Sequence, residues 1–144
     1  MIRVAKLAMC VCLAVSSALP VGARADKAEP VQIAGQCEYA DRLAPLLEQF
    51  HTFAICDRLQ MRRTGSRVEL HFNHASRNRS IRFAGAFEKE GRLNITGIRL
   101  RGQNEWNAAE GTCTFDPPEV ELPVVTCIVK SGARFFVANF APER

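Results

Sequence analysis

The stretch VELHFNHASRNRSIRF, residues 68–83, indicates most clearly how this chain folds. Apolar residues alternate with polar ones on both sides of the polar segment HASRNR, and this period of two is typical of β-strands with one buried face. The residues of the apolar face are Val68, Leu70, Phe72, Ile81 and Phe83. We therefore expect an antiparallel hairpin with its turn near residues 74–79.

The next strand candidate continues this pattern with one irregularity. Leu93 and Ile95 alternate with polar residues, but Ile98 and Leu100 have the opposite parity. One additional residue near Thr96-Gly97 places Ile98 and Leu100 on the same face as Leu93 and Ile95, which predicts a β-bulge at that point. Turn-like segments such as RTGS, KEG and RGQN separate the strand candidates at short intervals, so we expect an antiparallel meander.

The segment VVTCIVKSGARFFVANF, residues 124–140, is apolar on both faces of its predicted strands. Val125 and Cys127 share one face, while Val124 and Ile128 share the other. Such a hairpin is central in a sheet, closed into a curled sheet, or covered by a partner. Residues 124–140 are therefore also the segment through which we expect any oligomer to form.

Before these strands, the segment DRLAPLLEQFHTF, residues 41–53, has a helical spacing of apolar residues. Asp41 suits an N-cap, and Pro45 falls within the first turn, where its missing N–H is not needed. The apolar face consists of Leu43, Leu46, Leu47, Phe50 and Phe53. The fold class that we predict is α+β, with one N-terminal amphipathic helix packed on a curled antiparallel β-sheet of about six or seven strands.

The N-terminal residues have the features of an export signal. Arg3 and Lys6 precede an apolar run from Leu7 to Leu19, and Ala23-Arg24-Ala25 places small residues where a signal peptidase cleaves. The predicted divisions are a signal peptide at 1–25, a flexible leader at 26–36 and a single domain at 37–144. This organisation predicts a periplasmic or secreted protein.

The charge of the predicted mature chain is nearly balanced. Cleavage after Ala25 removes three of the 19 basic residues and none of the 15 acidic ones, so that the net charge falls from +4 to +1. This balance does not indicate nucleic acid as a partner. We also expect no membrane span in the mature form, because a spanning helix needs about 20 apolar residues in succession.

Four cysteines lie in the predicted mature chain, and an even set in an exported protein usually forms disulfides. Cys113 and Cys127 lie on neighbouring strand candidates joined by a Pro-rich loop, so a bond between them is geometrically easy. Cys37 then pairs with Cys56 across the predicted helix. No CxxC spacing is present, and we predict neither a metal nor another cofactor.

The two histidines of the opening stretch do not predict a metal site. His71 lies on the outward face of its predicted strand, opposite Val68 and Leu70. His74 is an odd number of residues away, so it points to the other face or lies in the turn. The stretch is therefore expected to form a hairpin without a metal.

Arginines are concentrated between residues 58 and 82, where seven of them accompany a single acidic residue, Glu69. Guanidinium groups bind phosphate and carboxylate groups in a bidentate geometry, which favours an anionic glycan, a lipid head group or an acidic protein as partner. The competing interpretation is a solvated face on which arginine stems cover apolar atoms. The candidate binding residues are Arg58, Arg62, His71, Arg82, Arg99, Arg101 and Trp106.

Trp106 is included because it is the only tryptophan and lies between Glu105 and Asn107 in a polar segment. A partly exposed tryptophan can anchor a sugar ring or a partner protein. The alternative is a tryptophan that covers the edge of the core.

Motifs of nucleophilic catalysis are missing from the sequence, which contains no GxSxG, no HExxH and no phosphate-binding glycine loop. A small hydrolase is still an alternative, in which the fold brings Ser66 or Ser80 together with His51 and Asp57. We predict a non-enzymatic, inhibitor-like binding protein. The alternatives are that hydrolase and a structural subunit of an envelope complex.

Overall fold

The computed structural model describes residues 29–49 and 51–144, so the predicted signal peptide lies outside the described residues. The described chain contains nine strands and one 3-10 helix. The elements are β1 (Val31–Cys37), η1 (Asp41–Glu48), β2 (His51–Phe53), β3 (Arg58–Thr64), β4 (Arg67–Asn73), β5 (Ser80–Lys89), β6 (Arg92–Leu100), β7 (Asn107–Asp116), β8 (Val124–Ser131) and β9 (Arg134–Pro142).

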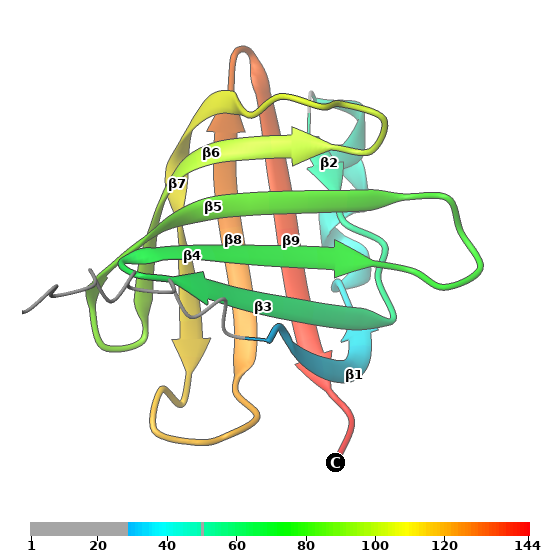
Figure 1. Cartoon of the computed structure of the whole chain (residues 1–144). Coiled ribbons are helices and arrows are strands. Elements are labelled where there is room, and N and C mark those ends of the chain that lie inside the picture. Colours follow the sequence, from blue (N-terminus) through cyan, green and yellow to red (C-terminus); the bar gives the residue numbers. More distant parts are fainter. Residues whose placement is uncertain (1–28, 50) are drawn as a thin grey trace, which may run out of the picture.

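Eight of the strands form a closed β-barrel (Figure 1). Strands β3 to β9 follow one another as an antiparallel meander. β1 closes the barrel because its first half pairs with β3 and its last residues, from Gly35 to Cys37, pair with β9. A side chain at Gly35 would collide with the ring of Phe140, so glycine permits the close contact at this seam.

The predicted α+β class is wrong, because the chain is nearly all β. The segment predicted as an amphipathic helix forms only the short 3-10 helix η1 and then the strand β2. Pro45 lies inside η1, and contrary to the expectation from the sequence its missing N–H matters, because in an α-helix that begins at Asp41 the N–H of residue 45 would donate to the Asp41 carbonyl. Residues 51–53 pair in parallel with residues 135–137 of β9, and this satisfies backbone groups that an open strand edge would leave without partners. Phe50 of the predicted helix face lies outside the described residues.

Two further expectations about the architecture need correction. Residues 31–37 form the closing strand β1, although the sequence placed residues 26–36 in a flexible leader. The sheet has nine strands instead of six or seven. Both corrections have the same cause, since β1 and β2 are short segments without a clear alternation and become strands by pairing with β9.

The barrel interior is formed by the apolar residues that the alternation selected. The exposed fractions of Val68, Leu70, Phe72 and Phe83 are all 1% or less. The rings of Phe72 and Phe83 meet edge to face with centroids 5.8 Å apart. A register shift between Ile95 and Gly97 confirms the predicted β-bulge.

Both predicted disulfides are confirmed. Cys113 and Cys127 lie directly opposite each other on β7 and β8, with Cα atoms 4.0 Å apart and both side chains buried in the barrel. Cys37 and Cys56 connect β1 to the segment that precedes β3. This pair of bonds is consistent with an oxidising compartment.

The two apolar faces of the β8–β9 hairpin follow from barrel closure. Cys127, Val129 and Phe136 point into the core. On the outside, Phe135 stacks on His51 with ring centroids 5.3 Å apart. Tyr39 donates its hydroxyl proton to the backbone carbonyls of Ala54 and Val137, so Tyr39 and His51 cover part of this outer face. Burial of the Tyr39 hydroxyl raises its pKa to about 12.

Candidate functional site

The predicted binding residues come from strands β3 to β6 and from the connection between β6 and β7, and we call this set the arginine wall. It comprises Arg58, Arg62, His71, Arg82, Arg99, Arg101 and Trp106. The strand registers arrange part of this wall as a transverse row, in which Gln60 lies opposite His71, His71 opposite Arg82 and Arg82 opposite Arg99. A second row joins Arg58, Asn73 and Ser80, and the backbone N–H of Arg101 donates to the Ser80 carbonyl.

Most arginines of the wall have no acidic partner. Arg58 contacts Asp57 at 3.4 Å, and the neighbouring Arg67 contacts Glu69 at 3.3 Å. Across the described part of the chain, no carboxylate lies within 4.0 Å of the guanidinium groups of Arg62, Arg82, Arg99 and Arg101. Burial and the nearby Arg99 lower the pKa of Arg82. The wall is therefore a set of cations held close together, with Glu69 opposite Arg62 and Asp57 beside Arg58 as acidic neighbours.

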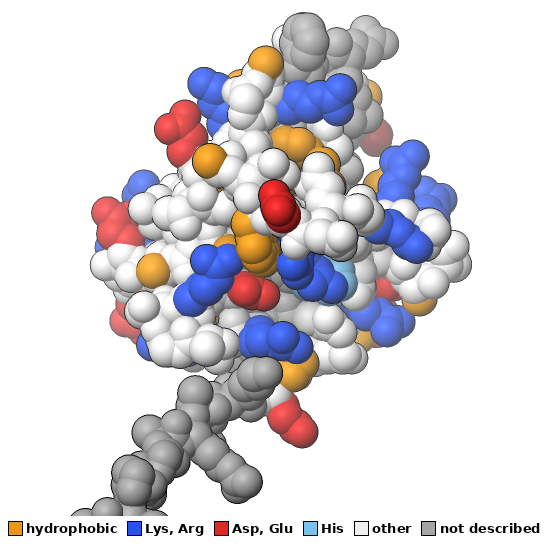
Figure 2. Space-filling view, turned by 45° about the horizontal axis from the view of Figure 1, so that its top comes forward, with side chains coloured by type: hydrophobic (Ala, Val, Ile, Leu, Met, Phe, Trp, Pro, Cys, Tyr) orange, Lys and Arg blue, Asp and Glu red, His pale blue; other side chains and the backbone are white. Residues whose placement is uncertain are grey.

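Trp106 is half-buried and lies between two arginines. The guanidinium carbons of Arg67 and Arg99 lie 4.9 Å and 4.7 Å from the indole centroid, distances at which cation–π attraction operates. A Cβ at Gly97 would touch the indole ring, so glycine at this position leaves room for Trp106 next to β6. Figure 2 shows basic side chains on both sides of an apolar patch, with a histidine beside them.

His71 is neutral in this setting. Burial, followed by the charges of Arg82 and Arg99, lowers its pKa to about 4. Its Nδ1 lies 3.1 Å from Oε1 of Gln60, so Nδ1–H donates to that oxygen and Nε2 carries a lone pair. Nε2 of His71 and Oδ1 of Asn73 are both buried without a hydrogen-bond partner. Unpaired buried polar atoms are uncommon in folded proteins.

Both residues line a hollow of about 220 Å³, which we call the cradle. The β4–β5 turn brings two more arginines, Arg77 and Arg79, to this hollow. The residues of the cradle are Arg58, His71, Asn73, His74, Ala75, Arg77, Arg79, Ser80 and Arg101. The sequence counted Arg77 and Arg79 in the basic segment but did not select them, because a turn has no periodicity that assigns a face.

Asp57 and His74 hold the turn in place. The backbone N–H of Ala75 donates to Oδ2 of Asp57 at 2.9 Å, and this bond is the main cause of the lowered Asp57 pKa. Nδ1 of His74 accepts from the backbone N–H groups of Ser76 and Arg77. These contacts order the backbone that carries the arginines of the cradle.

The residues proposed for a hydrolase are not assembled as a catalytic set. His51 bonds to the Gln49 carbonyl and stacks on Phe135, whereas Asp57 contacts Arg58, His74 and Ala75. Ser76, His74 and Asp57 lie close together, but the serine hydroxyl and the carboxylate both face the same ring nitrogen, Nδ1. A proton relay requires the two ring nitrogens to face different partners.

The described residues contain no group of three or more His, Cys, Asp or Glu side chains placed to hold a metal ion. In the same part of the chain, no helix is long and apolar enough to cross a membrane.

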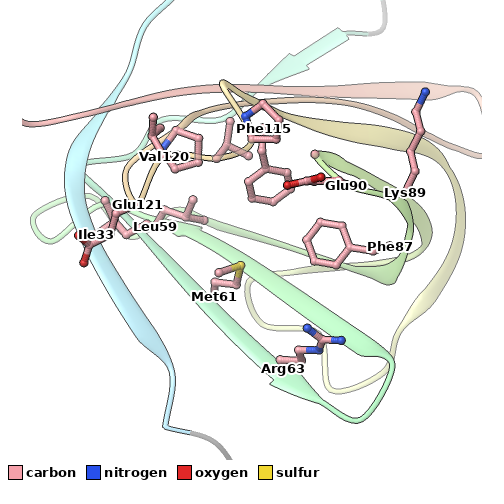
Figure 3. A pocket seen from close by; sticks show the side chains of 14 residues that line it. Ile33, Leu59, Met61, Arg63, Phe87, Lys89, Glu90, Phe115, Val120 and Glu121 are labelled. Carbon is pink, nitrogen blue, oxygen red and sulfur yellow. The ribbon is translucent and has the colours of Figure 1, made fainter.

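A second hollow lies at the end of the barrel, between the β5–β6 turn and the β7–β8 loop. Its volume is about 410 Å³, and its floor includes the buried Leu59 and Val125 (Figure 3). The backbone N–H of Phe115 donates to the Gly91 carbonyl, which fixes the turn to β7. Phe87 and Val120 line the rim and are 40% and 42% exposed. We call this hollow the apolar pocket.

The charged residues at the apolar pocket include both basic and acidic side chains. Arg63 and Lys89 lie at its edge together with Glu90 and Glu121. Residues 102–123 form an acidic segment with five carboxylate residues and no Lys or Arg. Glu121 belongs to this segment, and another of its acids, Glu110, contacts Lys130 at 3.9 Å. The acidic segment is thus dispersed around the barrel and forms no carboxylate pair within hydrogen-bond distance among the described residues.

Comparison with known proteins assigns no family to this barrel. A scan against protein-family models and searches of curated proteins and of solved structures found no match. Function is therefore argued from the geometry of the arginine wall and the two hollows.

Proposed function

We propose that this chain is an exported, non-enzymatic binding protein that recognises an anionic partner through the arginine wall. The partner is an anionic component of the cell envelope or an acidic protein. The observation that supports this function most strongly is that four wall arginines have no carboxylate within 4.0 Å among the described residues. Cations that are held close together repel one another, and a bound anion offsets the free energy of this repulsion.

Export is supported by the N-terminal sequence and by the two disulfides. We propose a periplasmic or secreted location for the mature protein. Expression of the full chain in a bacterium, followed by mass spectrometry of the protein from the periplasm and medium, tests this. A mature form that begins at Asp26 is expected, and an unprocessed chain confined to the cytoplasm would contradict it.

The binding function is tested with three immobilised polyanions: polyglutamate, polygalacturonate and phosphatidylglycerol vesicles. The protein should bind at least one of them, and its affinity should fall steeply with salt, because exposed charges are screened over about 10 Å at 0.1 M and about 3 Å at 1 M. Absence of binding to all three at low salt would contradict the proposal.

Variants locate this binding on the wall. Arg82→Gln with Arg99→Gln should weaken it by about tenfold or more, since hydrogen bonds to charged groups contribute about 1.5–3 kcal/mol each. The matched control replaces Arg42 and Arg144, which are exposed and do not belong to β3–β6. The control has the same change in net charge, and it should bind nearly as well as the unmodified protein.

The apolar pocket supports a second candidate function, the binding of a small apolar molecule. Its volume falls within the range of about 300–1,000 Å³ that is usual for small-molecule sites. A neutral fluorescent probe such as N-phenyl-1-naphthylamine should gain fluorescence on binding, and Met61→Trp, which fills the pocket, should reduce that gain. An unchanged signal in the variant would exclude the pocket as the site.

A further inference from the structure

The barrel end opposite the apolar pocket combines arginines with accessible apolar side chains. In an antiparallel meander, alternate turns lie at the same end, so the β4–β5, β6–β7 and β8–β9 connections all lie here. Each connection places one arginine at the end of a strand, since Arg79 precedes β5, Arg101 follows β6 and Arg134 begins β9. All three arginines line a cavity of about 290 Å³, which we call the cationic mouth.

Apolar side chains form the rest of the lining. On β9, Arg134 and Phe136 share a face because side chains alternate along a strand, and Phe136 is 4% exposed. On β5, Ile81 lies two residues after Arg79 and is 8% exposed. The other large apolar residues of the lining are half-buried and comprise Phe53, Ile55 and Leu100. Half-buried side chains leave apolar atoms that a ligand can contact, so apolar surface and guanidinium groups line one cavity.

The charge of the cationic mouth has one sign. Of the residues that the structure describes, no Asp or Glu lines this cavity, and no carboxylate lies within 4.0 Å of the guanidinium groups of Arg79, Arg101 and Arg134. The apolar pocket differs in this respect, since Glu90 and Glu121 line it. Guanidinium groups bind carboxylates and phosphates in a bidentate geometry, so the cationic mouth favours a ligand with an anionic group.

The segment that forms one side of the cationic mouth is held in place. Tyr39 donates its hydroxyl proton to the Ala54 carbonyl, and its ring packs on Phe53 with centroids 4.6 Å apart. The backbone N–H of Ala54 donates to the Val137 carbonyl at 2.8 Å. This part of the lining is therefore pre-formed, which lowers the entropic cost of binding a ligand.

We propose that the cationic mouth binds a single-chain amphiphile with an anionic head group, such as a medium-chain fatty acid. The head group lies on Arg79, Arg101 and Arg134, and the hydrocarbon chain contacts the apolar lining. The volume is close to the lower limit of the range of about 300–1,000 Å³ for small-molecule sites, which suits one short chain, and the mouths of β-barrels are common places for such sites. This inference goes beyond the proposed function, in which the anionic partner needs no apolar chain.

The dependence of affinity on chain length tests this inference. Acetate, hexanoate and octanoate share one head group and differ only in the chain, and calorimetry with the purified protein measures their affinities. The affinity should rise by up to about fourfold per CH₂ group from hexanoate to octanoate, because each buried CH₂ group removes apolar surface from water. Equal affinities for acetate and octanoate would overturn the inference, because the apolar lining would then contribute nothing.

Two further ligands with the octanoate chain length test the head group. Octanol is neutral and should bind at least about tenfold more weakly than octanoate, because it cannot form charge-assisted hydrogen bonds with the arginines. Octyl phosphate distinguishes a phosphorylated lipid from a fatty acid as the source of the head group, and the tighter of the two anions identifies it. Octanol that binds as tightly as both anions, or no binding of either anion, would overturn the inference.

Variants test the role of the arginines. Arg79→Gln with Arg134→Gln should lower the affinity for octanoate by about tenfold or more, and both residues are exposed, so the barrel should stay folded. The control, Arg42→Gln with Arg144→Gln, has the same change in net charge at residues that do not line the cationic mouth. Equal octanoate affinities of the two double variants would overturn the inference. Polyglutamate has no hydrocarbon chain, so its binding tests the arginine wall separately.

Amide NMR spectra of the unmodified protein with octanoate locate the site. Chemical-shift changes should lie in residues 52–55, 78–81, 100–101 and 134–136. Saturable changes confined to the residues around the apolar pocket would overturn the inference and assign the hydrocarbon chain to that pocket.

Discussion

The two hollows of this barrel differ in charge and polarity, although one strand contributes to both. On β3, Leu59 and Met61 line the apolar pocket, whereas Arg58 lines the cradle from the opposite face. The alternation of side chains along a strand therefore builds an apolar interior and a cationic exterior from the same few residues. This difference implies that the interior determines stability while the exterior can be changed for binding with little effect on folding.

The largest expected effect lies in the interior. Phe83→Ala should lower the free energy of unfolding by about 3–5 kcal/mol, because the fully buried ring leaves a cavity beside Phe72. The adjacent outward change, Arg82→Gln, should cost less than about 0.5 kcal/mol. Urea denaturation of both variants measures the contrast. Equal losses would mean that the wall arginines contribute to folding and would contradict the separation of the two faces.

An intermediate effect is expected for the disulfide inside the barrel. Replacing both Cys113 and Cys127 with alanine should destabilise the protein by about 2–4 kcal/mol, since the bond restricts the unfolded chain between β7 and β8. Affinity for polyanions should be unchanged at temperatures where the variant is folded. Denaturant unfolding and binding of the same sample measure both quantities, and a loss of binding by folded protein would connect the interior to the wall.

A smaller effect is expected from acid. The folded-state pKa of His71 is about 4, below its ordinary value of 6.5, so the unfolded chain binds a proton first as the pH falls. Stability should therefore decrease between pH 6.5 and pH 4 by about 1–2 kcal/mol from this residue, a value discounted because the ring is partly open to solvent.

The variant His71→Gln isolates that contribution. It keeps an amide that can bond to Gln60 but removes the titrating group. Thermal unfolding across this pH range should show a flatter profile for His71→Gln than for the unmodified protein. The neighbouring charges, Arg82 and Arg99, are unchanged in the comparison. Identical profiles would show that the wall does not hold His71 in its neutral form.

The regular strands could be predicted from the sequence because a strong local signal determined them. Val68, Leu70 and Phe72 alternate strictly, and the corresponding face is buried in the barrel. The bulge after Ile95 and the Cys113–Cys127 bond were predictable for similar reasons, since parity and neighbouring strands restrict them. The Cys37–Cys56 bond followed only as the remaining pair.

The segments at the seam could not be predicted in this way. Residues 31–37 become a strand by pairing with β3 and β9, and residues 51–53 by pairing with β9, so both depend on partners that are distant in the sequence. The helical spacing of the segment from Asp41 to Phe53 is a local preference that was overridden by these long-range hydrogen bonds. The alternation of apolar residues indicates which face of a strand is buried, but it does not indicate which distant segment pairs with that strand.

The candidate site could likewise be predicted from the sequence only where it lies on regular strands. The alternation correctly placed Arg82 and Arg99 on one outer face, where the strand register makes them neighbours. It could not include Arg77, Arg79 or the unpaired Oδ1 of Asn73, because these depend on the path of a turn and on hydrogen bonds. Whether the wall binds an anion is a prediction that neither the alternation nor the register tests.

The most direct test of the central claim is an amide NMR titration of the ¹⁵N-labelled protein with polyglutamate or oligogalacturonate at low salt. Binding to the arginine wall predicts chemical-shift changes in β3, β4, β5 and β6 and in the β4–β5 turn, with little change around the apolar pocket. The changes should reverse when the salt concentration is raised. Saturable shifts confined to other strands, or no shifts with either ligand, would contradict the account.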